Sequence, residues 1–243
     1  MGRNIVVSGG GSGIGRACAA WFTDQGDHVW LVGRREPNLI RAADMMGGRA
    51  DYIVADLSTV EGAEQVQARI ASATVDVIVC SAGGTAAKTP TDLSEIAYEW
   101  RADLEQNLMT SVLLFEALRE NIVRPGGRVI GIGSIGAQLG SGYGGSYGAA
   151  KAAMHGWMYW LAQSLGGDGV TANLVTPGFV PETEFFGARM DANFYSTRVE
   201  RSPMGRAGRL EDVADTVGFL ASAQASYITG QIIGVSGGTV FGR

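Results

Sequence analysis

Cysteine, histidine and lysine are scarce in this sequence. Its 243 residues include two cysteines, Cys18 and Cys80, and two histidines. Two cysteines cannot build a disulfide framework, and their spacing matches no metal-binding motif, which suits a reducing compartment. With only two histidines as well, a protein metal site is not expected. The chemistry of this chain should therefore need neither a metal nor a disulfide.

Positive charge and long hydrophobic stretches are missing too. The formal net charge is −5 and the isoelectric point is near 5.1. Nucleic acids and anionic membranes bind basic surfaces, so neither is expected as a partner. No apolar run reaches the length that spans a bilayer, and the N-terminus enters an apolar segment without a signal-peptide pattern. These absences predict a cytoplasmic protein whose partners are small molecules or other proteins.

What the sequence does contain is a regular alternation of β-branched runs and helical patterns. No proline-rich linker, repeat or low-complexity tract divides the chain, so residues 1–243 are expected to form one domain. Near-continuous apolar strands separated by helices predict a parallel sheet covered on both faces, a doubly wound α/β fold of the Rossmann type. The seven expected strands span residues 4–8, 28–32, 51–55, 75–79, 128–132, 170–175 and 231–235.

A glycine-rich segment, residues 9–15, leaves the first expected strand and runs directly into a helical pattern. In that setting, backbone N–H groups and the positive end of a helix dipole point at the same place. Such an arrangement favours a pyrophosphate and predicts a dinucleotide site. The alternative is a tight strand-to-helix turn that binds no ligand.

The end of the second expected strand indicates which dinucleotide is bound. Folds of this type usually carry an acid there for the ribose 2′-hydroxyl, whereas this chain has Gly33, Arg34 and Arg35. Arg34 can bind a 2′-phosphate through a forked, charge-assisted hydrogen bond. NADPH/NADP+ is therefore the expected cofactor. The alternative is that both arginines are simply solvated, and the adjacent Glu36 weakens the argument from the missing acid.

Lys151, one of only two lysines, follows Tyr147 by four positions in an alanine-rich helical pattern. A separation of four places both side chains on one face of a helix. A nearby ammonium group favours the phenolate and lowers the pKa of the tyrosine, which suits a general acid or base. A solvated helix face is the alternative for this pair taken alone.

Residues 179–209 interrupt the alternation between the last two expected strands and are rich in aromatic side chains. They are expected to form a partly mobile lid, because ligands in such folds bind at the carboxyl ends of the strands. A pair of surface helices at the sheet edge is the alternative. Phe179, Phe185 and Phe186, with Tyr143 from the glycine-rich segment 140–146, are expected to line a site for a bulky, apolar or aromatic ketone.

Together these motifs make the chain resemble the short-chain dehydrogenase/reductase family over nearly its whole length. The family's T-G-x-x-x-G-x-G loop resembles Ser8 to Gly15, with serine in place of threonine. Its N-N-A-G motif appears as Cys80 to Gly83, which departs from the family at both asparagines. Further family-like positions are Asp56, Leu57, Asn107, Ser134, Pro177, Gly178, the segment 225–231, Gly237 and Gly238.

The resemblance implies roles for four side chains. Tyr147 would protonate a carbonyl oxygen, and Ser134 would donate a hydrogen bond to the same oxygen. Lys151 would lower the pKa of Tyr147 and hold the nicotinamide ribose. Asn107 would position a water molecule in a proton relay behind Lys151. A turn serine, a core tyrosine and a helix asparagine that bonds its own backbone are the corresponding structural alternatives.

The resemblance also extends the expected cofactor contacts beyond Arg34 and Arg35. The full set is Ser8, Gly9, Gly11, Ser12, Gly13, Ile14, Gly15, Arg34, Arg35, Asp56, Leu57, Ser81, Ala82, Gly83, Tyr147, Lys151, Pro177, Gly178, Val180 and Thr183. The substrate contacts expected are Ser134, Tyr143, Tyr147, Phe179, Phe185 and Phe186.

The expected activity is reduction of a ketone to a secondary alcohol with NADPH. Length and C-terminal motifs resemble 3-oxoacyl-carrier-protein reductases and polyketide ketoreductases, so the ketone could arrive on a carrier protein. The composition looks like that of a GC-rich bacterial genome, which associates the chain with specialised metabolism. An alcohol or sugar dehydrogenase working in the oxidative direction and a non-catalytic NADPH-binding sensor remain alternatives. The family also implies a homotetramer, formed through residues 98–122, 147–166 and 231–235.

Overall fold

The centre of the molecule is one parallel β-sheet of seven strands. A computed structural model describes residues 2–85, 90–140, 144–187 and 190–242. The order of the strands across the sheet is β3-β2-β1-β4-β5-β6-β7, and every neighbouring pair is parallel. The strands are β1 (Asn4–Ser8), β2 (His28–Gly33), β3 (Ala50–Val54), β4 (Val77–Cys80), β5 (Arg128–Ile132), β6 (Thr171–Pro177) and β7 (Ile232–Val235).

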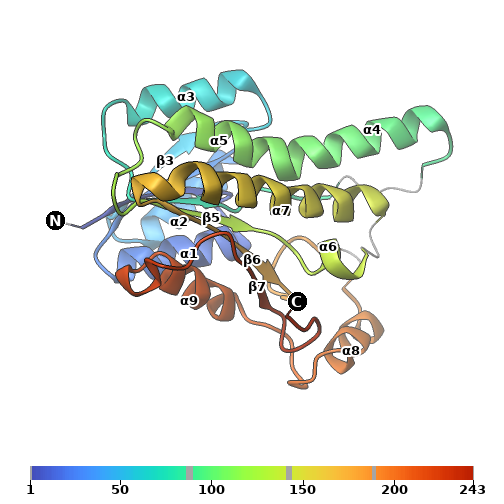
Figure 1. Ribbon diagram of the computed structural model, residues 1–243. Helices are drawn as coiled ribbons and strands as arrows, with labels where there is room; N and C mark the ends of the chain where they lie inside the picture. The colour runs from blue at the N-terminus through green and yellow to red at the C-terminus, as the bar shows by residue number, and fades with distance from the viewer. Residues whose placement is uncertain (1, 86–89, 141–143, 188–189, 243) are drawn as a thin grey trace.

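Helices cover both faces of the sheet (Figure 1). One face carries α1 (Gly13–Asp24), α2 (Glu36–Met45) and α9 (Leu210–Leu220), whose buried side chains share a single core cluster. The other face carries α3 (Val60–Ile70), α5 (Thr110–Leu118) and α7 (Gly145–Leu165). Shorter or peripheral helices are α4 (Leu93–Leu104), the π-helical turn η1 (Glu105–Met109), α6 (Gly136–Leu139), the 3₁₀ turns η2 (Gly166–Asp168) and η4 (Ala223–Ala225), and α8 (Ala192–Glu200).

The central strands are buried, and β4 is apolar throughout. All residues of β4, β5 and β6 are buried, since helices pack on both sides of them. Phe22 of α1 is fully buried on one side of the sheet, and Phe115 of α5 and Met158 of α7 are fully buried on the other. Because one face of each helix must meet the sheet, apolar residues recur there at helical spacing.

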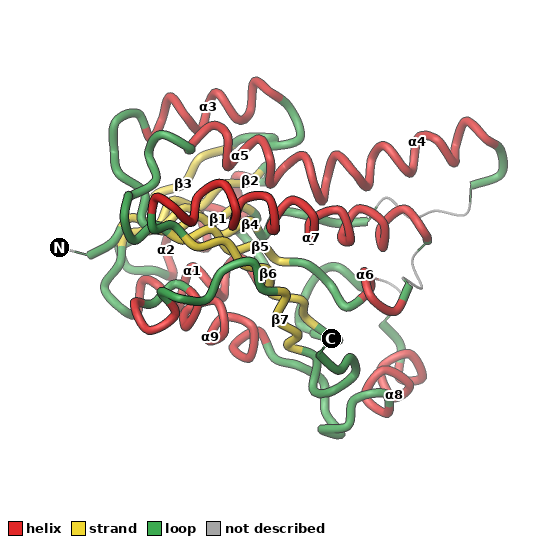
Figure 2. The backbone as a smooth tube through the Cα atoms, in the orientation of Figure 1, coloured by secondary structure: helices red, strands yellow, loops and turns green. Residues whose placement is uncertain are grey.

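The strand order places a topological switch between β1 and β4. The chain winds outward from β1 to β3 on one side and then returns to continue through β4 to β7 on the other. The loops at the carboxyl ends of β1 and β4 therefore diverge and leave a crevice, which is where folds of this type bind ligands. Figure 2 shows the strands running together toward the end of the molecule that carries α6 and α8.

The predicted doubly wound fold and all seven predicted strands are confirmed, with small shifts at their ends. The fourth strand begins at Val77, and Val75 instead forms an isolated bridge with Ile122. The sixth strand extends to Pro177. Within residues 179–209, the structure describes the helix α8. No helix among the described residues is long and apolar enough to cross a membrane.

Candidate active site

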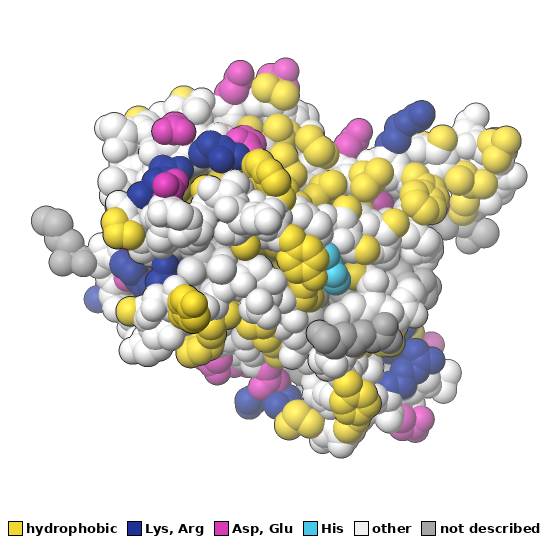
Figure 3. Space-filling model, in the orientation of Figure 1, with side chains coloured by type: hydrophobic (Ala, Val, Ile, Leu, Met, Phe, Trp, Pro, Cys, Tyr) yellow, Lys and Arg dark blue, Asp and Glu magenta, His cyan; other side chains and the backbone are white. Residues whose placement is uncertain are grey.

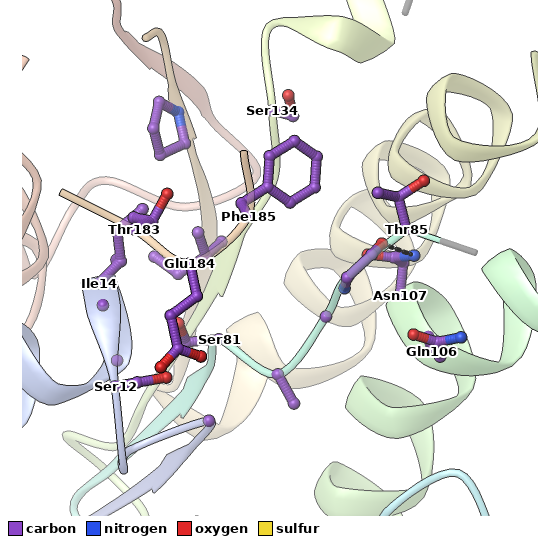
Figure 4. A pocket seen from close by; sticks show the side chains of 18 of the residues that line it. Ser12, Ile14, Ser81, Thr85, Gln106, Asn107, Ser134, Thr183, Glu184 and Phe185 are labelled. Atoms are coloured by element: carbon purple, nitrogen blue, oxygen red, sulfur yellow. Dashed lines mark hydrogen bonds between the residues drawn. The ribbon is translucent and has the colours of Figure 1, made fainter. Parts of the chain in front are cut away.

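A cavity of about 630 Å³ opens at the carboxyl ends of the strands, around the switch point. Its walls come from the glycine loop after β1, the ends of β2 to β6, the helices η1 and α7, and the segment that contains α8. In Figure 4, Ser12 and Ile14 lie on one side of this cavity and Asn107 and Gln106 on the other, with Phe185 and Ser134 between them.

The glycine loop has the shape of a phosphate cradle. Gly9 and Gly13 adopt positive φ angles of 67° and 51°, a backbone that side chains disfavour. A Cβ atom on Gly15 would collide with the carbonyl oxygen of Gly9, so only glycine permits this close approach. Helix α1 begins at Gly13, and its N-cap residue Ser12 makes no capping hydrogen bond through its side chain. The N–H groups of the first turn therefore remain available to an anion.

Ser8 is a correction to the expected cofactor contacts. Its side chain is fully buried and does not line the cavity. The Oγ atom of Ser8 accepts hydrogen bonds from the backbone N–H groups of Ser81 and Ala82, both at 3.0 Å. Ser8 therefore holds the loop after β4, whose residues Ser81 and Ala82 line the cavity.

Arg34 and Arg35 both line the cavity near the adenosine end of the expected cofactor site. Arg34 Nη1 lies 3.9 Å from Asp56 Oδ2. Burial works to raise the pKa of Asp56, but hydrogen bonds from Ser58 and the charge of Arg34 hold it below its usual value. The Asp56 carboxylate is therefore ionised and keeps Arg34 beside the cavity.

Arg35 has a partner that the sequence analysis missed. Its Nη2 atom donates to Glu184 Oε2 at 2.6 Å and to Ser12 Oγ at 3.2 Å. Glu184 belongs to the segment after β6, and its carboxyl group points toward Ser12 across the cavity (Figure 4). An acid thus reaches the expected 2′-phosphate region from a distant part of the chain.

Tyr147 and Lys151 lie in the first turns of α7 and are 6% and 5% exposed, respectively. The Nζ atom of Lys151 donates to the carbonyl oxygen of Ile132, at the end of β5, at 2.9 Å. Burial lowers the pKa of Lys151 to about 8, because the ammonium group has lost most of its hydration. Ser134 follows the same strand and lines the cavity, with its Oγ atom accepting from the N–H of Gly136 at 3.0 Å.

Asn107 lies in the π-helical turn η1 and is fully buried. Its Nδ2 atom donates to the carbonyl oxygens of Asp103 and Gly84, each at 2.9 Å. Gly83 shows that Asn107 and Lys151 converge: a Cβ atom placed there would lie 2.7 Å from Asn107 Oδ1 and 3.2 Å from Lys151 Nζ. The amide oxygen and the ammonium group therefore face one small space beside the cavity, which can hold a relayed proton.

Aromatic rings from the segment after β6 pack beside the ring of Tyr147. The ring of Phe185 lies 5.2 Å from the ring of Tyr147, and Phe185 also contacts Phe186 at 5.2 Å. Phe179 and Phe194 extend the cluster, with ring distances to Phe186 of 5.1 and 5.8 Å. Of the predicted lid, residues 179, 180, 183–186, 198 and 201 line the cavity. That residues 179–209 act as a partly mobile lid stays a prediction. Tyr143 lies outside the described residues.

The structure brings the remaining expected site residues to the cavity wall, and it adds several that were not expected. The newly found lining residues with polar or charged side chains are Asn38, Ser58, Thr85, Gln106, Thr110, Glu184, Arg198, Arg201 and Thr239. Ser58 and Thr85 follow the ends of strands, and this position could have indicated that they line the site. No local pattern marks Glu184, Arg198 or Arg201. Among the described residues, no cluster of three or more histidine, cysteine or acidic side chains could hold a metal ion.

A phosphate cradle at the switch point, with a buried tyrosine and lysine behind it, defines the class of dinucleotide-binding oxidoreductases. The comparisons with known proteins specify the family. A family model described as "Enoyl-(Acyl carrier protein) reductase" matches residues 9–240. The 3-oxoacyl-[acyl-carrier-protein] reductase FabG of Escherichia coli is 32% identical over 240 residues, which cover 98% of this chain and 97% of the relative. The chain belongs to the short-chain dehydrogenase/reductase family.

Solved structures agree with this assignment. A short-chain dehydrogenase/reductase from Mycobacterium ulcerans superposes with a TM-score of 0.89 at 30% identity, covering 98% of this chain and 89% of that one. A putative NAD(P)-dependent gluconate 5-dehydrogenase from Beutenbergia cavernae with bound NADP gives 0.88 at 35% identity, covering 98% and 96%. The RhlG/NADP complex of Pseudomonas aeruginosa gives 0.87 at 28% identity, with coverage of 98% and 96%.

Proposed function

We propose that this protein reduces a ketone to a secondary alcohol with NADPH. The observation that carries the proposal is the convergence of Asn107, from η1, and Lys151, one turn after Tyr147 on α7, at Gly83 on the wall of the cavity that the glycine loop also lines. A binding protein without catalysis has no need to bury an ammonium group behind a tyrosine, because that burial costs folding free energy.

The cavity fits the cofactor. The glycine loop and the first turn of α1 would hold the pyrophosphate, and Arg34 and Arg35 would hold a 2′-phosphate. Two of the similar solved structures, the RhlG complex and the gluconate 5-dehydrogenase, contain NADP, which supports NADPH here. When bound, NADPH supplies a hydride.

The side chains would then supply the proton. Tyr147 donates it to the carbonyl oxygen, and Ser134 donates a hydrogen bond to the same oxygen, where negative charge develops. The ammonium group of Lys151 stabilises the phenolate that Tyr147 becomes when it donates its proton. Asn107 holds its amide oxygen toward Lys151, so that a water molecule there can return the proton from solvent.

We propose a bulky or aromatic ketone, of the 3-oxoacyl or polyketide type, as the substrate. The aromatic cluster of Phe179, Phe185, Phe186 and Phe194 supports this proposal, because it offers an apolar wall next to Tyr147. The FabG relatives are named for acyl groups bound to a carrier protein. Arg198 and Arg201 also line the cavity and would suit the phosphate of a carrier-bound acyl chain.

The oxidation of an alcohol or sugar is the second candidate. The gluconate 5-dehydrogenase is 35% identical to this chain, and the same residues serve the reverse reaction. Whether the protein works as a reductase or as a dehydrogenase therefore depends on the substrate that the cavity accepts.

The test is NADPH consumption by the purified protein. The panel contains 3-oxoacyl thioesters, both free and carrier-bound, bicyclic and aromatic ketones, and an enoyl thioester. NADP+ with gluconate or simple secondary alcohols tests the oxidative direction. Tyr147→Phe is the matched control, since it removes only the hydroxyl.

Each outcome discriminates between the candidates. Turnover of a ketone that disappears in Tyr147→Phe supports the reductase. Turnover of gluconate alone favours the second candidate, and NADPH binding without turnover of any substrate favours a sensor. A carrier-bound thioester that loses its rate advantage in Arg201→Glu would support delivery by a carrier.

We also propose a homotetramer, as is usual for proteins of this family. The exposed aromatic side chains on α4 and α7 support this proposal, because apolar surfaces of this kind mark protein interfaces.

A further inference from the structure

Asp103, on α4, is an acidic side chain that the proposed reaction does not use, and it is 0% exposed. A carboxyl group removed from water loses its hydration, which costs folding free energy unless hydrogen bonds replace it. A buried acid is therefore retained at a position where its hydrogen bonds serve a purpose. Here the carboxylate accepts a hydrogen bond from Ser146, beside Tyr147, while the backbone carbonyl of Asp103 accepts one from Asn107.

The carboxylate of Asp103 contacts the residue next to Tyr147. Ser146 is 3% exposed, and its Oγ atom donates to Asp103 Oδ2 at 2.7 Å. The backbone carbonyl oxygen of Asp103 in turn accepts from Asn107 Nδ2 at 2.9 Å. One residue thus joins the beginning of α7 to the turn that carries Asn107.

The beginning of α7 needs such a contact. Its N-cap residue, Gly144, makes no side-chain capping bond and has a φ of 105°, so the helix starts without the usual support. Tyr147 is the third residue of this helix, within the turn that frays most easily. The bond between Ser146 and Asp103 is a side-chain contact that holds this turn against a neighbouring helix.

We propose that Asp103 is a positioning residue for the proposed reaction. Through Ser146 it fixes the first turn of α7, and hence the hydroxyl of Tyr147, relative to Asn107 and Lys151. The inference rests on the proposed function, because a misplaced Tyr147 matters only if Tyr147 transfers a proton. It concerns the placement of the tyrosine and not the binding of the cofactor.

The test separates positioning from simple stability. The double variant Asp103→Leu/Ser146→Ala replaces both side chains of the hydrogen bond between Asp103 and Ser146 by apolar groups. Replacement of a buried polar pair in this way is often neutral or stabilising. The matched variant Asp103→Asn keeps an acceptor oxygen for Ser146 and loses only the charge.

We expect the double variant to retain the melting temperature of the native chain and its dissociation constant for NADPH. Its kcat should fall by about 10- to 100-fold, the range expected when a reacting group is misplaced by about 1 Å. Asp103→Asn should keep kcat within a few-fold of the native value. If Asp103 had a purely structural role, kcat would be unchanged in every variant that folds.

Hydrogen exchange provides a readout that does not need turnover. The amides of residues 148–151 donate to carbonyl oxygens of the first turn of α7, so they should exchange faster in the double variant and not in Asp103→Asn. Native kcat or native exchange in a folded double variant would overturn the proposal. If the native chain turns over no substrate, the proposed function fails, and the exchange measurement still decides whether Asp103 holds the turn.

Discussion

At the residue scale, Gly83 lies close to both Asn107 and Lys151, the two side chains of the proposed proton relay. A Cβ atom there would lie 2.7 Å from Asn107 Oδ1 and 3.2 Å from Lys151 Nζ. Gly83→Ala should therefore push the amide and ammonium groups apart and lower kcat by about 10- to 100-fold, because a small displacement of catalytic groups is enough to slow proton transfer. The measurement is steady-state kinetics with a substrate found in the panel.

A matched glycine on α7 provides the control. Gly156 has open space around its Cβ position and lies inside the helix. Gly156→Ala should leave kcat unchanged and stabilise the fold by about 0.5–1 kcal/mol, because alanine loses less backbone entropy in a helix. Equal kcat for native and Gly83→Ala proteins would show that the space between Asn107 and Lys151 is not used.

Lys151 makes a second residue-scale prediction, on pH and stability. Its pKa in the folded chain is about 8, below the value of about 10.4 expected in the unfolded chain. Below pH 8 the folded protein must hold a charged, desolvated group, which reduces the free energy of unfolding. As the pH rises from 8 to about 10.4 this penalty disappears, since the unfolded chain then binds more protons than the folded one.

Lys151→Met should therefore raise the free energy of unfolding by roughly 1–3 kcal/mol at pH 7, and the gain should shrink toward pH 10. Urea unfolding of both proteins at pH 7, 8.5 and 9.5 measures the difference and cancels the other titrating groups. Turnover should be lost in the same variant. A gain that stays constant with pH would show that the buried charge is not its cause.

At the scale of elements, the ion pair between Arg35 and Glu184 joins the glycine-loop region to the segment after β6. Arg35 Nη2 lies 2.6 Å from Glu184 Oε2, with both side chains more than half exposed. A 2′-phosphate would have to compete with this carboxylate for Arg35. Glu184→Gln should therefore tighten NADPH binding by about two- to fivefold, in keeping with the modest strength of an exposed pair, and leave NADH binding unchanged.

Fluorescence titration with both dinucleotides measures this effect, and Arg35→Gln is the matched partner variant. If Glu184→Gln instead weakens both dinucleotides equally, the ion pair closes the segment over the cofactor and does not compete with the 2′-phosphate. The effect should also decrease at high salt, because exposed charges are screened.

The elements themselves were predictable because each has a local signal. The strands β4, β5 and β6 are buried on both faces and so appear as short β-branched runs, and the cradle appears as glycines between a strand and a helix. Glu184 had no such signal, since its contact with Arg35 spans 149 positions of the chain. Asp103 meets Ser146 across 43 positions, again without a local pattern. Ser8 was predicted to contact the cofactor from its place in the glycine-loop motif. The motif does not determine the direction of its side chain, which depends on packing.

At the scale of the whole molecule, one face carries exposed aromatic side chains. Tyr98 and Trp100 on α4 are 68% and 44% exposed, and Tyr159 and Trp160 on α7 are 52% and 47% exposed. Figure 3 shows hydrophobic side chains gathered over these helices. An apolar surface of this kind marks a protein interface. The residues fall within the segments predicted to form the tetramer, which stays a prediction, as does the cytoplasmic location.

The last prediction concerns this face. Sedimentation at micromolar concentration should give a mass four times that of the 25.4-kDa chain. Tyr159→Glu/Trp160→Glu should reduce the mass, because charges cannot be buried there without partners. Met45→Glu, on α2 at the opposite face of the sheet and 74% exposed, should leave the mass unchanged. The dissociated variant should still bind NADPH, since Tyr159 and Trp160 are not among the residues that line the cavity. A monomeric native chain would exclude the assembly.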